Sequence, residues 1–290
     1  MKNDFAKYIA GLLLFGANGV IASFIALDSR QIVLLRAVLA SALLLVIFFL
    51  SGKRFSMLKN RRDIFLIAVS GAAMAADWLF LYEAYDRLGV GLSILINYTG
   101  PAIVIALSPF ILKEKITAKK LCALFAALLG AVFISGSAVS GGTDIRGIVC
   151  AAASAVAYAV MVLSNKLTSE IKGSDNSMLQ VLFTTAVVTV YSAFKGSFAM
   201  DISPSDYLPI IVLGLVCTGL ACHLYFSSIG GLSAQTVGVC GYLEPLFSVL
   251  LSALVLHETL SAMQALGAVL IIGGALYGEI NFPKKHKRAA

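Results

Sequence analysis

The sequence predicts an all-α membrane protein of ten transmembrane helices, arranged as two inverted five-helix repeats with both termini in the cytoplasm. Three observations lead to this fold class: an apolar composition, a series of long apolar stretches, and a pattern that recurs 144 residues later. The chain of 290 residues is 59% hydrophobic and 13% charged, with a mean hydropathy of +0.93. Soluble domains carry roughly 25% charged residues, so lipid is the expected solvent for most of this surface.

The apolar stretches set the expected helices. A membrane-spanning helix needs ~20 apolar residues, and runs such as LCALFAALLGAVFISG do not alternate as barrel strands do. Short connections leave no room for a soluble domain. The predicted spans are 6–26, 31–51, 64–85, 91–112, 119–137, 145–165, 178–195, 207–228, 234–256 and 261–280.

The distribution of positive charge predicts the orientation in the membrane. With the N-terminus inside, 17 of the 22 Lys and Arg residues fall in cytoplasmic segments and four on the opposite side. The remaining residue, Arg36, lies within the span 31–51. This asymmetry follows the positive-inside rule, and it argues for a lipid bilayer rather than nucleic acid as partner. The basic tail, 282–290, is expected to anchor the C-terminus in the cytoplasm.

An internal repeat divides the chain into two halves. Residues 94–131 and 238–275 align without gaps at an offset of 144, with nine identical positions. The shared residues include Tyr98 and Tyr242, Pro101 and Pro245, and Glu114 and Glu258. A fixed offset over this length indicates duplication. We therefore expect a first repeat in 1–140 and a second in 141–281.

Five helices per repeat make the second repeat enter the membrane in the opposite direction. The loop KEKITAKK around Glu114 is basic, whereas its counterpart HETLSAMQ contains no Lys or Arg, as opposite sides of the membrane require. Inverted repeats are typical of secondary transporters, whose substrate site lies near the bilayer midplane between the halves.

The segment LEPLFSVLLSALVLHETLSAMQALGAVLIIGG resembles the last two helices of EamA-type members of the drug/metabolite transporter superfamily. The matching first-half segment and the stretch LLRAVLA around Arg36 resemble other helices of that family. The resemblance implies a 5+5 inverted-repeat carrier with a central cavity and no catalysis, so no enzyme is expected. It also implies small metabolites as substrates, often moved outward, and a multi-pass protein of the plasma membrane, here a bacterial inner membrane.

Ionisable residues inside the membrane are the first candidates for a site, because each costs ~2.5–3.5 kcal/mol on insertion scales. Asp77 lies near the middle of its span beside Trp78, the single tryptophan. An acid beside an aromatic face suits an ammonium group. The alternative is a structural ion pair between Asp77 and Arg36 that holds two helices together, and both interpretations stay open.

Glu244 precedes Pro245 in the middle of another span, and Gly100 occupies the matching position in the first half. Pro101 and Pro245 are expected to bend their helices because proline removes a backbone donor. The carboxylate of Glu244 either bonds to polar neighbours or carries a proton during transport, because desolvation favours the neutral form of a carboxyl group. His223 is a second candidate for proton coupling, with a structural role as the alternative.

Neutral polar residues near the centres of several spans complete the candidate site. Asn18, Asn97, Tyr98, Tyr158 and Tyr242 either line a pocket or form hydrogen bonds between helices. Glu83, nearer the outer interface, is expected to be solvated or to pair with Arg30 or Arg87. The small residues of 119–137 and 261–280 predict close helix contacts, either between these two helices or across a dimer interface.

The expected activity is alternating-access transport of a small polar metabolite, an amino acid or amine, coupled to protons. No P-loop pattern GxxxxGK[ST] is present, so ATP is not expected to drive it directly. No cofactor or metal is predicted, because the three histidines are scattered and no CxxC spacing occurs. An uptake carrier for a cationic or nucleobase-like solute, a lipid flippase and an intramembrane enzyme are the alternatives. The carrier is expected to be a monomer or a homodimer.

Overall fold

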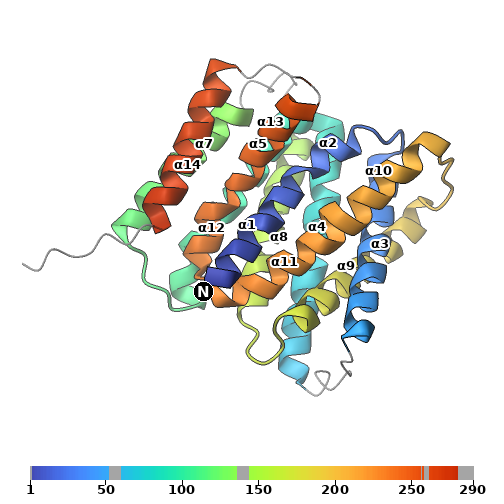
Figure 1. Cartoon of the computed structure of the whole chain (residues 1–290), viewed down its shortest axis with the longest axis horizontal. Helices are drawn as coiled ribbons and strands as arrows, with labels where there is room; N and C mark the ends of the chain where they lie inside the picture. The colour runs from blue at the N-terminus through green and yellow to red at the C-terminus, as the bar shows by residue number, and fades with distance from the viewer. Residues whose placement is uncertain (1, 52–59, 136–143, 256, 258–260, 280–290) are drawn as a thin grey trace, which may run out of the picture.

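The computed structural model describes residues 2–51, 60–135, 144–255, 257 and 261–279, and Figure 1 shows them as a bundle of helices. No strand occurs in these ranges. The expected basic tail and Glu258 lie outside them. The first part of the chain forms α1 (Lys2–Gly16), α2 (Asn18–Ala22), α3 (Ser29–Leu50), α4 (Arg61–Leu88), α5 (Val90–Asn97), α6 (Thr99–Ile111) and α7 (Ala118–Ser135). The remainder forms α8 (Ile145–Lys166), α9 (Ser174–Lys195), η3 (Pro204–Asp206), α10 (Tyr207–Ile211), η4 (Val212–Leu220), α11 (Ala221–Ser228), η5 (Ile229–Gly231), α12 (Ala234–Gly241), α13 (Leu243–Val255) and α14 (Ala262–Glu279).

Several long helices begin at a polar residue that caps their first turn. The side chain of Asp28 accepts a hydrogen bond from the backbone N–H of Arg30 at the start of α3, and Asn60 caps α4 in the same way. Asp144 accepts from the N–H of Arg146 at the start of α8. A helix leaves its first N–H groups without a partner inside the helix, and these side chains satisfy one of them.

Eight helical stretches of the described chain are long and apolar enough to cross a membrane. The segment Ala262–Gly278 is a shorter apolar helix, and α7 covers most of the predicted span 119–137. Every predicted span therefore coincides with a helix or with consecutive helices. The count of ten crossings stays a prediction.

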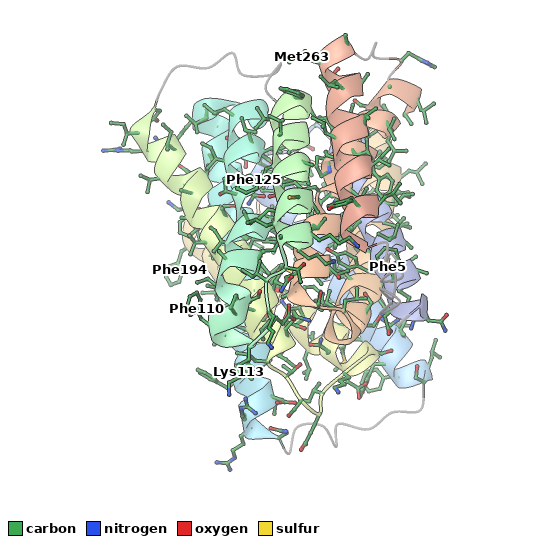
Figure 2. All side chains as sticks on the ribbon, turned by 90° about the vertical axis from the view of Figure 1, so that its left-hand side faces the viewer. Phe5, Phe110, Lys113, Phe125, Phe194 and Met263 are labelled. Atoms are coloured by element: carbon green, nitrogen blue, oxygen red, sulfur yellow. The ribbon has the colours of Figure 1, made fainter. Side chains whose placement is uncertain are left out.

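The outside of the bundle is apolar. Phe110 is 82% exposed, Phe194 87% and Phe125 63%, and Figure 2 shows all three side chains projecting from the outside of the ribbon. Large apolar side chains in such numbers on the surface indicate a hydrocarbon environment rather than water. These helices and this surface identify the chain as a multi-pass membrane protein.

Three helical paths are interrupted near the middle of the bundle. The first breaks at Ala17 between α1 and α2, the second at Tyr98 between α5 and α6, and the third at Tyr242 between α12 and α13. The second and third breaks fall three residues before Pro101 and Pro245. The missing proline N–H leaves the carbonyl four residues earlier without its helical partner, which explains the position of these breaks.

The helices α7 and α14 pack against each other at one edge of the bundle (Figure 1). A Cβ atom added at Gly130 would lie 2.6 Å from the carbonyl oxygen of Gly267, and one at Gly267 would lie 2.6 Å from that of Gly130. Farther along, a Cβ at Gly274 would lie 2.9 Å from the carbonyl oxygen of Ala123. The small residues of these helices thus serve contact within the chain, one of the two expected roles. A Cβ atom added at Gly273 would have no neighbouring atom within 4 Å, so Gly273 takes no part in this contact.

These contacts relate positions that are 144 residues apart. Gly130 corresponds to Gly274 and Ala123 to Gly267, so the contact between Gly130 and Gly267 repeats between Gly274 and Ala123. The hydroxyl oxygens of Ser41 and Thr185, another corresponding pair, lie 2.7 Å apart between α3 and α9. An approximate two-fold axis between inverted halves produces such reciprocal contacts. The inverted repeat remains a prediction that they support.

Candidate functional site

A cavity of about 500 Å³ lies in the middle of the bundle, where the interrupted helices meet α3, α4, α8 and α11. Its walls come from residues of both predicted halves. The polar and aromatic residues that line it are Phe15, Asn18, Ser29, Arg36, Asp77, Trp78, Tyr82, Tyr85, Asn97, Tyr98, Tyr158, Tyr225, Phe226, Glu244 and Ser248. Cavities of roughly 300–1,000 Å³ with a few polar groups among apolar and aromatic side chains are typical sites for small molecules.

Asp77 is held by hydrogen bonds from two other helices. Its Oδ1 accepts from Ser154 Oγ at 2.6 Å and from Asn97 Nδ2 at 3.0 Å, and Asn97 Nδ2 also lies 2.6 Å from Ser154 Oγ. Asp77 is 7% exposed. Among the described residues, Oδ2 has no hydrogen-bond partner. The network orients the carboxylate and leaves one oxygen free in a residue that lines the cavity.

Arg36 does not form the expected structural ion pair with Asp77. The guanidinium carbon of Arg36 instead lies 4.0 Å from the centre of the Trp78 ring. The ion pairs that the structure describes elsewhere join Arg30 to Asp28 and Arg87 to Glu83 and Asp144. The hydrogen bonds from Asn97 and Ser154 give Asp77 other partners, and the indole gives the guanidinium a face on which to stack. The Trp78 ring was expected to contact the ammonium group of a substrate, but in the structure its face is already occupied by the Arg36 guanidinium.

Glu244 also lines the cavity, and its carboxylate forms no hydrogen bond or ion pair with any described residue. The difference from Gly100 in the first half has a packing cause. A Cβ atom at Gly100 would lie 2.9 Å from Tyr158 Cδ1 and 3.0 Å from the Ala155 carbonyl oxygen, because α8 presses on α6 there. In the second half, α13 packs against α1, and here the glycine that allows the close approach is Gly16 on α1. A Cβ atom at Gly16 would meet Phe247 and the Glu244 carbonyl oxygen. Only the second half has room for an acid.

The structure brings most of the predicted substrate-binding residues together. Asn18, Asn97, Tyr98 and Tyr158 line the cavity with Asp77 and Trp78. Sequence reasoning missed three lining tyrosines, Tyr82, Tyr85 and Tyr225. Two of them could have been predicted from the sequence, because Tyr82 and Tyr85 follow Trp78 at helical spacings of four and seven residues and so share its face of the helix.

Two predicted residues lie elsewhere. Tyr242 is fully buried behind the cavity, and its hydroxyl donates to the carbonyl oxygen of Tyr98 at 2.7 Å, which is the interhelical bond that was its alternative role. His223 is not among the lining residues, and its carbonyl oxygen accepts from the hydroxyl of Ser177. Glu83 pairs with Arg87 at 2.7 Å near the end of α4, as expected.

The cavity extends toward one end of the bundle. Ile25, Leu27 and Ser29 line it, in and beside the connection between α2 and α3, and Phe24 in that connection is 50% exposed. The lining includes no residue of the connections between α6 and α7, α8 and α9, or η5 and α12. These three connections lie at the end that the charge distribution assigns to the cytoplasm.

Direct contacts close that opposite end. Both carboxylate oxygens of Glu114 accept from the backbone N–H of Ala234 at the start of α12, and Gln235 Nε2 donates to the Lys115 carbonyl oxygen at 2.9 Å. Lys166 Nζ donates to the carbonyl oxygens of Ile229 and Leu232. The bonds of Glu114 and Lys115 join the two predicted halves, whereas those of Lys166 lie within the second half. We refer to Glu114, Lys115, Lys166, Ala234 and Gln235 as the closing contacts.

Comparison with known proteins places this arrangement in a family. The model of the EamA-like transporter family matches residues 7–136 and again residues 145–277. The chain belongs to the EamA-like transporter family. Several of its curated relatives are named as uncharacterized transporters. The two matched segments fall within the two predicted halves, 1–140 and 141–281.

Three curated proteins illustrate the similarity of this EamA-like chain to its relatives. The "Uncharacterized transporter YxxF" of Bacillus subtilis (strain 168) is 24% identical over 92% of this chain and 86% of its own. The "Uncharacterized transporter YetK" of the same organism is 29% identical over 83% and 75%. The "Probable amino-acid metabolite efflux pump" of Salmonella typhimurium is 22% identical over 71% and 73%.

A solved crystal structure of a protein has the same fold, with a TM-score of 0.84, over 96% of this chain and 97% of its own. At 19% identity it supports the fold alone. Family membership and the relatives' names indicate a transporter rather than an enzyme. In this EamA-like protein, Asp77 and Glu244 share the cavity, whereas His223, the second candidate for proton coupling, does not line it.

Proposed function

We propose that this EamA-like protein is a proton-coupled secondary active transporter of an amino acid or amine, working by alternating access, with export as the favoured direction. One observation carries the proposal: a central cavity of about 500 Å³ holds Asp77 and Glu244 together with Arg36. Ionisable residues this deep in a membrane protein mark substrate and proton pathways.

Asp77 supports the binding of an ammonium group. Asn97 and Ser154 hold its Oδ1, so the carboxylate has a defined direction before substrate arrives. A group held in this way loses little freedom on binding, which favours affinity. The relative named as a probable amino-acid metabolite efflux pump, at 22% identity, is consistent with this class of substrate and with export.

Glu244 supports proton coupling. Its carboxylate has no partner among the described residues and lines the same cavity as Asp77. The negative charge that Glu244 gains on releasing a proton would therefore interact electrostatically with an ammonium group bound at Asp77. We assign the coupling proton to Glu244. His223 is the weaker candidate, because it lies away from the cavity.

Alternating access draws support from the closing contacts. The cavity extends to the connection between α2 and α3, and hydrogen bonds between the two halves close the other end. If the protein lies in a bacterial inner membrane with its termini on the cytoplasmic side, this arrangement corresponds to an outward-facing conformation. Exchange of roles between two inverted repeats would produce the inward-facing one.

A second candidate is an uptake carrier for a cationic or nucleobase-like solute. The observation that favours it is the number of tyrosines around the cavity, because aromatic faces accept both cations and planar rings. A flippase and an intramembrane enzyme remain further alternatives without such an observation.

Reconstitution in liposomes tests the proposal. Each of the amino acids, simple amines and nucleosides is supplied as a labelled solute, and its flux is measured with and without a pH gradient in either direction. We expect saturable counterflow for at least one amino acid or amine and a rate that follows the gradient. Absence of gradient-dependent flux for every solute would refute the coupled carrier, and flux of nucleosides alone would favour the second candidate.

A further inference from the structure

We propose that Arg36 binds the carboxylate of the transported molecule, so that the site selects α-amino acids as zwitterions and discriminates against amines and esters. The inference rests on the proposed function and narrows its substrate class. It assigns to Arg36 a role in recognition in place of the expected structural ion pair.

Arg36 is a buried cation with an incomplete set of partners. It is 7% exposed, and its Nε is buried without a hydrogen-bond partner among the described residues. Neither terminal nitrogen donates to a described protein group. The stack on Trp78 satisfies one face of the guanidinium, 4.0 Å from the ring centre, but it leaves the N–H edge without acceptors. A buried charge in this state is costly unless something pairs with it.

Within the part of the chain that the structure describes, no acid lies within salt-bridge distance of this guanidinium. The ion pairs among the described residues engage Arg30 and Arg87, not Arg36. Asp77 is the nearest expected acid, yet the bonds that its Oδ1 accepts come from Asn97 and Ser154. The guanidinium fork matches a carboxylate in two parallel hydrogen bonds. The N–H edge of the guanidinium is therefore open to a carboxylate from outside the chain.

An α-amino acid complements the charges of the cavity. Its carboxylate would pair with Arg36, and its ammonium group would meet the free oxygen of Asp77 in the same cavity. An amine would leave the guanidinium unpaired, and a methyl ester would offer it a much weaker acceptor. A site built for a polar partner rejects an analogue that lacks it, because its buried group then stays unsatisfied.

Equilibrium binding to the purified full-length protein tests this assignment. The 20 standard amino acids are screened for thermal stabilisation, and the one that binds best is compared with its methyl ester and its decarboxylated amine. The buffers contain no added carboxylate and the same low salt concentration for every ligand, so that competition of buffer anions for the guanidinium is small and equal. We expect the amino acid to bind at least about tenfold more tightly than either analogue.

Two substitutions and a matched control assign the discrimination to Arg36. In Arg36→Gln, the ratio between amino acid and ester is expected to fall to about one, because the charge-assisted bonds are lost. Arg36→Lys keeps the charge without the planar fork and is expected to fall between the two; it carries the test if Arg36→Gln does not fold. Arg30→Gln removes a partly exposed arginine from the same helix, and its ratio is expected to match wild type.

The outcomes separate this inference from the transport function. An ester or amine that binds wild type as tightly as the amino acid overturns the role of Arg36, as does full discrimination in Arg36→Gln or Arg36→Lys. Binding of no amino acid also overturns it. In each case, gradient-dependent flux of an amine in liposomes would leave the proposed carrier standing, and loss of all flux would refute both.

Discussion

Both carboxylate oxygens of Glu114 accept a hydrogen bond from the backbone N–H of Ala234, at 2.8 and 3.0 Å. Glu114 follows α6 in the first predicted half, and Ala234 is the first residue of α12 in the second. The carboxylate therefore supplies both an acceptor and a negative charge to the start of a helix, where N–H groups and the helix dipole favour an anion. This single contact joins the two halves at the closed end.

Glu114→Ala is expected to loosen the closed end of the bundle. The substitution removes charge-assisted bonds of about 1.5–3 kcal/mol, so the first turn of α12 should exchange its amide protons faster. Hydrogen–deuterium exchange of the segment 234–241 measures the change. Glu170→Ala is a matched control, because this exposed acid lies at the same end on the connection after α8. Unchanged protection in Glu114→Ala would show that the contact does not hold the end closed.

Asp77→Asn is expected to abolish transport of a substrate with an ammonium group. The amide has almost the same shape but no charge for the ammonium, so affinity should fall by about tenfold or more. Binding and counterflow in liposomes provide the measurements. Asp86→Asn, an exposed change on the same helix α4, should leave both unaffected. Wild-type affinity in Asp77→Asn would exclude Asp77 from the site.

Glu244→Gln is expected to uncouple solute movement from protons. The amide fills the same space but cannot release a proton, so solute exchange should continue while the response to a pH gradient disappears. Counterflow at equal pH and net flux under a gradient are measured on the same vesicles. If exchange also stops, a structural role of Glu244 becomes the better account, and a preserved response to the gradient would move the coupling to another group.

Gly100→Ala is expected to destabilise the protein. The added methyl group would lie 2.9 Å from Tyr158 Cδ1 and 3.0 Å from the Ala155 carbonyl oxygen, and overpacking of this kind costs about 1–3 kcal/mol. Thermal unfolding in detergent measures the loss. Gly273→Ala is the control, because nothing lies within 4 Å of its added Cβ. Equal stability of Gly100→Ala and wild type would mean that α6 and α8 separate at little cost.

The positions of the helices could be predicted because the signal is local. Hydropathy over some 20 residues reports the solvent of a segment, and each predicted span coincides with helical structure. The pairing of α7 with α14 was likewise within reach, since small residues at helical spacing indicate close approach. Sequence could not choose between a contact inside the chain and one between chains, because both use the same small residues.

The partners of the buried charges could not be predicted in the same way. Asp77 and Arg36 lie at comparable depth in neighbouring spans, which suggested an ion pair. Ser154, 77 residues away, and Asn97 take the carboxylate instead, and Trp78 takes the guanidinium. Hydrogen-bond choice depends on which side chains converge from different helices, and no sequence window contains that information.

By itself, the sequence showed that this is a membrane protein built of helices. It also identified Asp77 and Glu244 as acids within the membrane spans, where a charge costs free energy. It further showed that a glycine, Gly100, occupies the position of the first half that corresponds to Glu244. Only the tertiary structure decided why. At Gly100 the Tyr158 side chain and the Ala155 carbonyl group of α8 occupy the place of a side chain. In the second half the glycine of the corresponding contact is Gly16 on α1, which leaves position 244 free for a carboxylate. Close packing between distant segments, not local propensity, determines which half carries the acid.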